Sequence, residues 1–134
     1  MSIDAIELTI YQAFEIGKKK DLNAIQRIHS KSVSKFSDIP PYNLQDYNDV
    51  CLHEELFFAS ISDYNFKIHD LKIDLFDNIA LATFILEQEG ILVNNYNFTG
   101  ERLHMRSRAT MVLKNENKRE WRIIHEHYSI IPER

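Results

Sequence analysis

The sequence contains very little cysteine, glycine and proline. Its single cysteine, Cys51, excludes an internal disulfide, and its place on a predicted apolar helix face indicates a buried structural thiol. Only 3 glycines and 3 prolines among 134 residues leave little room for flexible linkers. We therefore expect one folded domain over residues 1–134, in a reducing compartment.

Positive charge and long apolar runs are also scarce. Lysine and arginine number 16 against 20 acidic residues, which argues against a general attraction to nucleic acid or to an anionic membrane. No apolar run reaches the ~18 residues that a membrane span needs. The first residues are acidic and amphipathic, unlike a signal peptide. We expect a cytoplasmic protein that has no nucleic-acid or membrane partner.

Helical spacing dominates the first half of the chain. An apolar stripe over residues 3–17 predicts a first helix, and a shorter second helix follows Asp21. Asn43 followed by Asp46 predicts the start of a third helix, which is expected to end near Ser62. Between the second and third helices, residues 30–42 are polar and contain a proline pair, so we predict a loop there.

The second half of the chain changes to strand-like alternation. Apolar residues alternate over 64–75, but their parity slips at His69 and Asp70, which predicts a bulge and a sharp bend. Residues 79–93 are apolar on both faces, so both faces must be covered. A loop at 94–98 precedes a final hairpin. Three helices followed by four strands predict an α+β domain with a strongly curved sheet.

The final hairpin carries the most distinctive pattern of the chain. Its first arm, residues 108–113, reads Arg-Ala-Thr-Met-Val-Leu, and its second arm is residues 121–129. Period-two alternation predicts two faces on the second arm: Trp121, Ile123, His125, His127 and Ser129 on one, and Arg122, Ile124, Glu126 and Tyr128 on the other.

This hairpin resembles the SnoaL-like group of the nuclear-transport-factor-like superfamily. The superfamily also contains ketosteroid isomerases and the association domain of calcium/calmodulin-dependent protein kinase. The resemblance implies a cone-shaped α+β fold, in which three N-terminal helices pack on the concave face of a strongly curved, mainly antiparallel sheet. It also implies a ligand pocket inside the cone and a homodimer formed through the open face of the sheet.

The resemblance assigns the Glu126 and Tyr128 face of the hairpin to the pocket. The residues it implies for the pocket are Tyr11, Phe14, Asp38, Phe57, Met111, Arg122, Glu126 and Tyr128. Tyr11 and Asp38 resemble the oxyanion donor and the proton-abstracting aspartate of ketosteroid isomerases, and Glu126 is a further candidate base or ligand anchor. These three residues are the catalytic candidates, and the sequence does not decide whether the protein is an enzyme.

The opposite face of the hairpin presents two histidines. The spacing of His125 and His127 can chelate a metal from a strand, but no third ligand is evident. The interpretation we favour is a signature or interface network of hydrogen bonds. Its members are Arg108, Thr110, Trp121, His125, His127 and Ser129. We predict no bound metal and no cofactor.

Two classes of function remain open at this point. The first is a homodimeric SnoaL-like protein with an enclosed, mostly apolar pocket for a small organic molecule, with isomerase, cyclase or hydrolase activity as candidates. The second is an assembly or accessory domain whose pocket is not catalytic. An arginine-rich surface for an anionic ligand, centred on Arg102, Arg106 and Arg108, is a further alternative to ordinary ion pairing.

Overall fold

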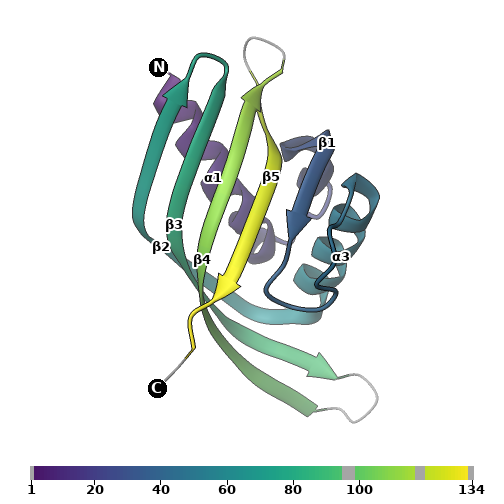
Figure 1. Ribbon diagram of the computed structural model, residues 1–134. Coiled ribbons are helices and arrows are strands. Elements are labelled where there is room, and N and C mark those ends of the chain that lie inside the picture. Colours follow the sequence, from purple (N-terminus) through teal and green to yellow (C-terminus); the bar gives the residue numbers. More distant parts are fainter. Residues whose placement is uncertain (1, 95–98, 117–119, 133–134) are drawn as a thin grey trace.

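A computed structural model describes residues 2–94, 99–116 and 120–132 of the protein. The elements follow in the order α1 (Ser2–Lys19), α2 (Ala24–Ile28), β1 (His29–Phe36), α3 (Tyr47–Ser60), β2 (Ile61–Phe76), β3 (Ile79–Asn94), β4 (Thr99–Asn115) and β5 (Trp121–Ile130). The helices form one layer and the strands the other (Figure 1). This confirms the predicted α+β class.

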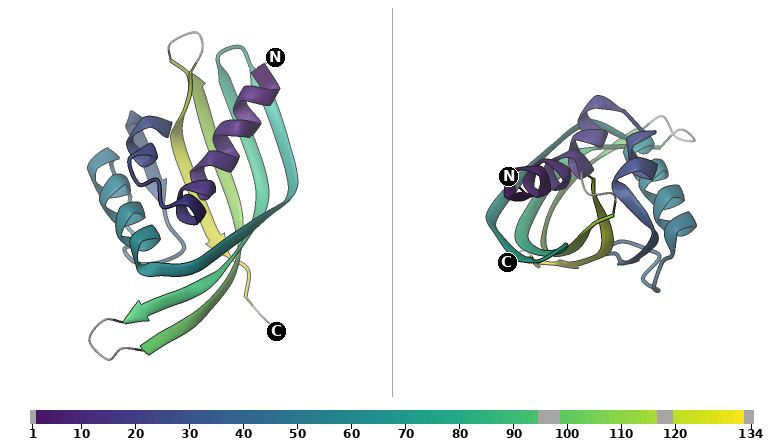
Figure 2. Two further views of the ribbon diagram at one scale, coloured as in Figure 1. Left: turned by 180° about the vertical axis from the view of Figure 1, so that it is seen from behind. Right: turned by 90° about the horizontal axis from the view of Figure 1, so that it is seen from above.

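The strands form one five-stranded sheet in the order β1-β5-β4-β3-β2. β1 pairs with β5 in parallel, and the other three pairs are antiparallel. The sheet curls around the helices, so that α1 and α3 lie on its concave side (Figure 2). The predicted arrangement of helices inside a curved, mainly antiparallel sheet is confirmed.

One strand was not expected from the sequence. β1 occupies most of the segment that the sequence predicts to be a loop, residues 30–42. Its register with β5 shifts between His29 and Ser34, which places several residues of β1 outside regular pairing. Buried and exposed residues therefore do not alternate along β1, and its sequence has no period-two pattern that would predict a strand.

Bulges bend the long strand β2. Its register with β3 shifts between Ser62 and Asn65 and again between His69 and Lys72. Each shift contains an aspartate with positive φ, 52° at Asp63 and 56° at Asp70. Bulges of this kind bend a strand and increase its twist. The predicted bulge at His69 and Asp70 is confirmed, and the loop predicted at residues 94–98 lies mostly outside the described residues.

A third bulge lies in β5 and corrects the predicted facing of the hairpin. The register with β4 shifts so that Leu113 pairs with Ile123 and Val112 pairs with His125, which leaves Ile124 as the extra residue. Trp121 and Ile123 are therefore buried on the same face as Glu126 and Tyr128. The two-face division predicted for residues 121–129 is wrong at this point, because one bulge reverses the parity of a strand.

Helix α1 seals one side of the concave face. Ile6, Ile10 and Ala13 are buried in the core, and the Phe14 ring contacts the rings of Phe84 and Tyr128, with centroid distances of 6.1 and 6.5 Å. Edge-to-face ring pairs of this kind fix the position of the helix on the sheet. Among the described residues, no helix is both long enough and apolar enough to cross a lipid bilayer.

Candidate functional site

A cavity of about 340 Å³ lies between the helices and the concave face of the sheet. The apolar part of its wall comes from Ala13, Phe14, Ile39, Pro40, Pro41, Leu56, Phe57, Phe58, Leu86 and Met105. The polar part comes from Lys35, Ser37, Asp38, Gln45, His53, Glu54, Ser60, Gln88, Glu126 and Tyr128. A mixture of aromatic walls with a few convergent polar groups is typical of small-molecule sites.

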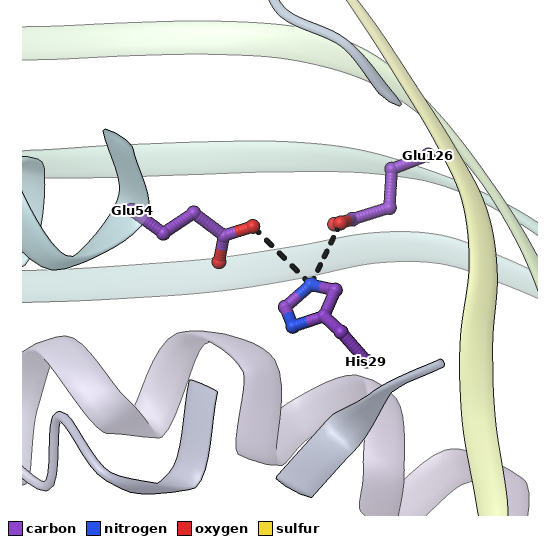
Figure 3. A group of neighbouring side chains, drawn as sticks. All are labelled: His29, Glu54 and Glu126. Atoms are coloured by element: carbon purple, nitrogen blue, oxygen red, sulfur yellow. Dashed lines mark hydrogen bonds and ion pairs between the residues drawn. The ribbon is translucent and has the colours of Figure 1, made fainter. Parts of the chain in front are cut away.

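Four charged side chains, which we call the buried ion cluster, lie at the polar end: His29, Lys35, Glu54 and Glu126. They come from three elements, because His29 and Lys35 belong to β1, Glu54 to α3 and Glu126 to β5. Lys35 pairs directly with Glu126 across the two parallel strands. Figure 3 shows His29 between the two carboxylates. Charged groups this deep in a protein are stable only when they are paired.

His29 is completely buried and uses both ring nitrogens. Its Nδ1 lies 2.7 Å from the carbonyl oxygen of Ile25, which can only accept, so Nδ1 carries a proton. Its Nε2 lies 2.9 Å from Glu126 Oε2 and 3.2 Å from Glu54 Oε2. Burial alone would lower the pKa of His29, but the two carboxylates outweigh it and hold that pKa well above 6.5. His29 is therefore an imidazolium ion at neutral pH.

Glu126 is held as a carboxylate by its neighbours. Burial would raise its pKa, but Lys35, His29 and a hydrogen bond donated by the Tyr128 hydroxyl lower the pKa to about 2. That hydroxyl lies 2.5 Å from Glu126 Oε1. Burial and the adjacent carboxylate raise the pKa of Tyr128 well above its usual value. Tyr128 therefore stays protonated, and Glu126 is a poor proton acceptor at neutral pH.

Lys35 completes the charge balance of the cluster. Its Nζ lies 3.2 Å from Glu54 Oε2 and 5.2 Å from the centroid of the Tyr128 ring. Burial lowers its pKa, but Glu54 and Glu126 have the larger combined effect and raise it. The buried ion cluster thus contains two cations and two carboxylates. Its members neutralise one another and form one rigid wall of the cavity.

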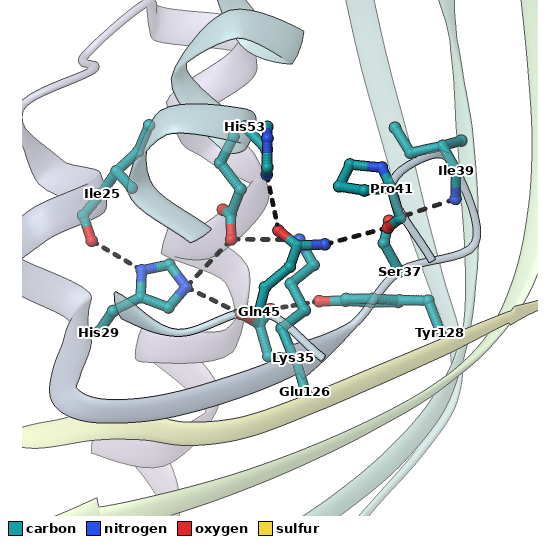
Figure 4. Close-up of polar contacts among 11 residues, drawn as sticks. Ile25, His29, Lys35, Ser37, Ile39, Pro41, Gln45, His53, Glu126 and Tyr128 are labelled. Atoms are coloured by element: carbon teal, nitrogen blue, oxygen red, sulfur yellow. Dashed lines mark hydrogen bonds and ion pairs between the residues drawn. The ribbon is translucent and has the colours of Figure 1, made fainter. Parts of the chain in front are cut away.

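The segment after β1 supplies the other side of the polar end. Gln45 is buried, and its backbone exchanges hydrogen bonds with that of Lys35 at 2.9 and 3.1 Å. Its side chain accepts from His53 Nδ1 at 2.9 Å and donates to the Pro41 carbonyl at 3.3 Å (Figure 4). These bonds hold residues 37–45 against the sheet. Asp38 lies within that segment and accepts a hydrogen bond from the Ser107 hydroxyl of β4.

One group of ligating side chains could bind a metal ion. Within the described residues, only one set of three or more histidine, cysteine or carboxylate side chains has all its ligand atoms within 4.8 Å of one another. Its members are His29, Glu54 and Glu126. An ion at this point would have to displace the Nε2 proton of His29 and compete with the ammonium group of Lys35 for Glu54. The protons of the two cations already neutralise these carboxylates, so the cluster is complete in itself.

The structure brings together five of the eight residues predicted for the pocket. Phe14, Asp38, Phe57, Glu126 and Tyr128 line the cavity. The other three are Tyr11, Met111 and Arg122. Tyr11 packs its ring against Phe66, Met111 is fully buried in the core, and Arg122 forms ion pairs with Glu116 and Glu120. Tyr11 therefore does not line the cavity that Asp38 lines.

The predicted hairpin network takes a different form. His125 Nδ1 lies 2.8 Å from the Ser34 hydroxyl of β1, and the rings of both His125 and His127 contact Phe36. Thr110 and Arg108 stand opposite His127 and Ser129 in the β4–β5 register. Trp121 is buried on the other face, because the bulge separates it from His125.

Sequence reasoning missed three of the four members of the buried ion cluster. His29 and Lys35 lie in or beside the segment predicted to be a loop, and the irregular pairing of β1 left no pattern to identify them. Glu54 did carry a signal, because it stands between Val50 and Phe58 on the buried side of α3. A charged residue on the apolar side of a helix indicates a buried partner.

Fold and cavity together define a cone-shaped α+β domain with a ligand-sized interior. By sequence, residues 6–133 match the SnoaL-like domain family, and the chain belongs to that family. No curated protein sequence matches the chain.

Several solved structures share the fold. A cystatin-like protein from Caulobacter vibrioides has 19% identity and a TM-score of 0.77, with 97% of this chain and 89% of that chain covered. A candidate dehydratase of the NTF2-like family from Streptomyces avermitilis has 14% identity and a TM-score of 0.81, with 98% and 97% covered. The CaMKII hub of S. rosetta has 18% identity and a TM-score of 0.73, with 96% and 95% covered. At these identities the likeness shows the fold alone.

Proposed function

We propose that this protein binds a small organic molecule in the cavity between its helices and the concave face of the sheet. The observation that carries the proposal is the cavity itself, about 340 Å³, with aromatic side chains on one side and the buried ion cluster at the other. A concave space of this size, lined by aromatic side chains and by a few convergent polar groups, is typical of a small-molecule site.

The two parts of the wall have separate roles in this proposal. Phe14, Phe57 and Phe58 contact the apolar body of the ligand and gain its buried surface. The polar end orients the ligand, because the positions of Glu54 and Glu126 are fixed by ion pairs and hydrogen bonds before the ligand arrives. Such preorganisation reduces the ordering cost of binding.

A screen of small organic molecules by thermal shift tests this proposal. We expect at least one class of compound to raise the melting temperature of the wild-type protein, because a ligand that binds only the folded state stabilises it. The variant Met105→Trp adds bulk at a half-buried lining position and should abolish the response. Its matched control is Leu103→Trp, two residues earlier on β4 and outside the cavity lining.

Two results would contradict the proposal. The first is the absence of any stabilising compound in a broad screen. The second is an equal response from the wild-type protein and from a folded Met105→Trp variant, because a ligand that ignores the filled cavity must bind elsewhere.

Assembly is a second candidate role, and we propose that the protein forms a homodimer through its sheet. The convex face of the sheet, opposite the helices, carries the half-buried apolar side chains of Ile79, Leu81, Ile85 and Val112. The fold likeness to the S. rosetta CaMKII hub adds weight to self-association. In this alternative the convex face is the functional surface and the cavity serves no reaction.

A further inference from the structure

We propose that the molecule held in the cavity carries a protonated amine beside its apolar body. This inference rests on the proposed function, because it names the ligand class of the same cavity. Three carboxylates face one end of the cavity, and each neighbouring cation is already bound to one of them. The end of the cavity is therefore suited to a ligand that donates hydrogen bonds and brings positive charge.

Neither cation of the buried ion cluster is available to an incoming anion. His29 is fully buried, and its two nitrogens are directed at Ile25, Glu54 and Glu126. Lys35 is bound to Glu54 and packs against the face of Tyr128. An anionic ligand would have to take Lys35 from Glu54 and leave that carboxylate buried with too little positive charge, which is strongly unfavourable.

Carboxylate oxygens, in contrast, remain available to a donor. Within the described residues, the side chain of Asp38 receives a hydrogen bond only from Ser107, through Oδ2, so Oδ1 is open. Among the residues that the structure describes, the contacts of Glu54 use Oε2 and leave Oε1 open. Both residues line the cavity. An ammonium group has three donors and no acceptor, which matches such a surface.

Charge counting leads to the same ligand class. Counted as formal charges, the three carboxylates of Asp38, Glu54 and Glu126 stand against the two cations His29 and Lys35. The surplus of one negative charge falls to Asp38, a half-buried residue of the cavity wall, where electrostatic interactions are stronger than in bulk solvent. Phe57 and Phe58 also line the cavity, and aromatic rings can attract a cation.

Three probes with the same aromatic body test the inference: phenethylamine, phenylacetate and phenethyl alcohol. Titrations followed by NMR give the affinity of each probe for the wild-type protein. We expect phenethylamine to bind about tenfold or more tightly than phenylacetate, as hydrogen bonds to charged groups allow. Phenethyl alcohol should lie between them, because it gains the apolar contacts without the charge.

The variant Asp38→Asn isolates the role of the charge. The asparagine amide retains an oxygen that accepts from Ser107, so the local structure has a partner to keep. We expect this variant to lose about tenfold in phenethylamine affinity and to bind phenethyl alcohol as before, which also shows that the cavity is intact. Asp74→Asn, outside the cavity lining, makes the same change in net charge and should leave all three affinities unchanged.

Several results would overturn the inference. Phenylacetate binding as tightly as phenethylamine would show that the cavity does not select positive charge, while leaving the cavity proposal intact. An Asp38→Asn variant with unchanged amine affinity would remove Asp38 as the anchor. If none of the three probes binds, the amine inference fails, and the broad screen with Met105→Trp decides separately whether the cavity binds any molecule.

Discussion

The side chains of the buried ion cluster should make the free energy of unfolding fall both at acidic pH and at pH values above 6.5. The pKa of His29 is raised above 6.5 in the folded state, so its stabilising contribution is complete below pH 6.5 and is lost as the pH rises through the folded value. The pKa of Glu126 falls from 4.5 to about 2, so its contribution is complete above pH 4.5 and is lost as the pH falls through about 2.

We therefore expect the free energy of unfolding to be greatest between about pH 4.5 and pH 6.5. Urea titrations over a pH series measure it. The variant His29→Gln should flatten the decline above pH 6.5, because its amide does not titrate, whereas His127→Gln, an exposed position on β5, should keep the decline. An unchanged decline in His29→Gln would show that another group causes it.

On the final hairpin, single residues of the site were predictable where their position followed from local alternation. Glu126 and Tyr128 are two residues apart with no bulge between them, so their shared face was predicted correctly. Arg122 was assigned to that face by the same alternation, and the bulge at Ile124 separates it from them. A bulge depends on the pairing of two strands, which a single-strand pattern does not contain.

The junction between α3 and β2 depends on one lysine from another part of the chain. Lys20 has a left-handed backbone, with φ of 57°, directly after α1, and its Nζ donates to the carbonyl oxygens of Phe58 and Ile61. Phe58 lies in the last turn of α3 and Ile61 is its C-cap, where a helix has unpaired acceptors and a negative dipole end. Lys20 therefore joins the end of α1 to the end of α3.

We expect Lys20→Met to lower the free energy of unfolding by about 1–3 kcal/mol, because two hydrogen bonds from a charged donor are lost. Lys19→Met is the matched control. It replaces the exposed lysine that directly precedes Lys20 and should change stability by less than about 0.5 kcal/mol. Chemical denaturation of both variants measures the difference, and equal effects would show that Lys20 contributes only its charge.

The positions of helices and strands along the chain were more predictable than the pairing between elements distant in sequence. The third helix was expected from Asn43 followed by Asp46, and in the structure the N-cap is Asp46, with the reciprocal hydrogen bonds to Asp49 that define a capping box. β3 was expected from its apolar run. β1 was missed, because a polar strand with irregular pairing is held in the sheet by contacts with β5 and the segment at Gln45, which are distant in sequence.

At the scale of the molecule, the two faces of the sheet have different surroundings. The concave face is covered by the helices, whereas the convex face leaves Leu81 and its apolar neighbours half-buried in the single chain. A row of apolar side chains in the middle of a sheet is typical of a surface that is covered by a partner. The sequence predicted this from the strand at 79–93, whose two faces are both apolar.

Sedimentation velocity tests whether a second copy covers the convex face. We expect the wild-type protein to be a dimer and Leu81→Arg to be a monomer, because an unpaired charge in a buried interface costs about 3 kcal/mol or more, at least a hundredfold in the dissociation constant. Leu8→Arg places the same substitution on the exposed side of α1 and should remain a dimer. A wild-type monomer would contradict the proposed homodimer, and a stable species larger than a dimer would favour the assembly role.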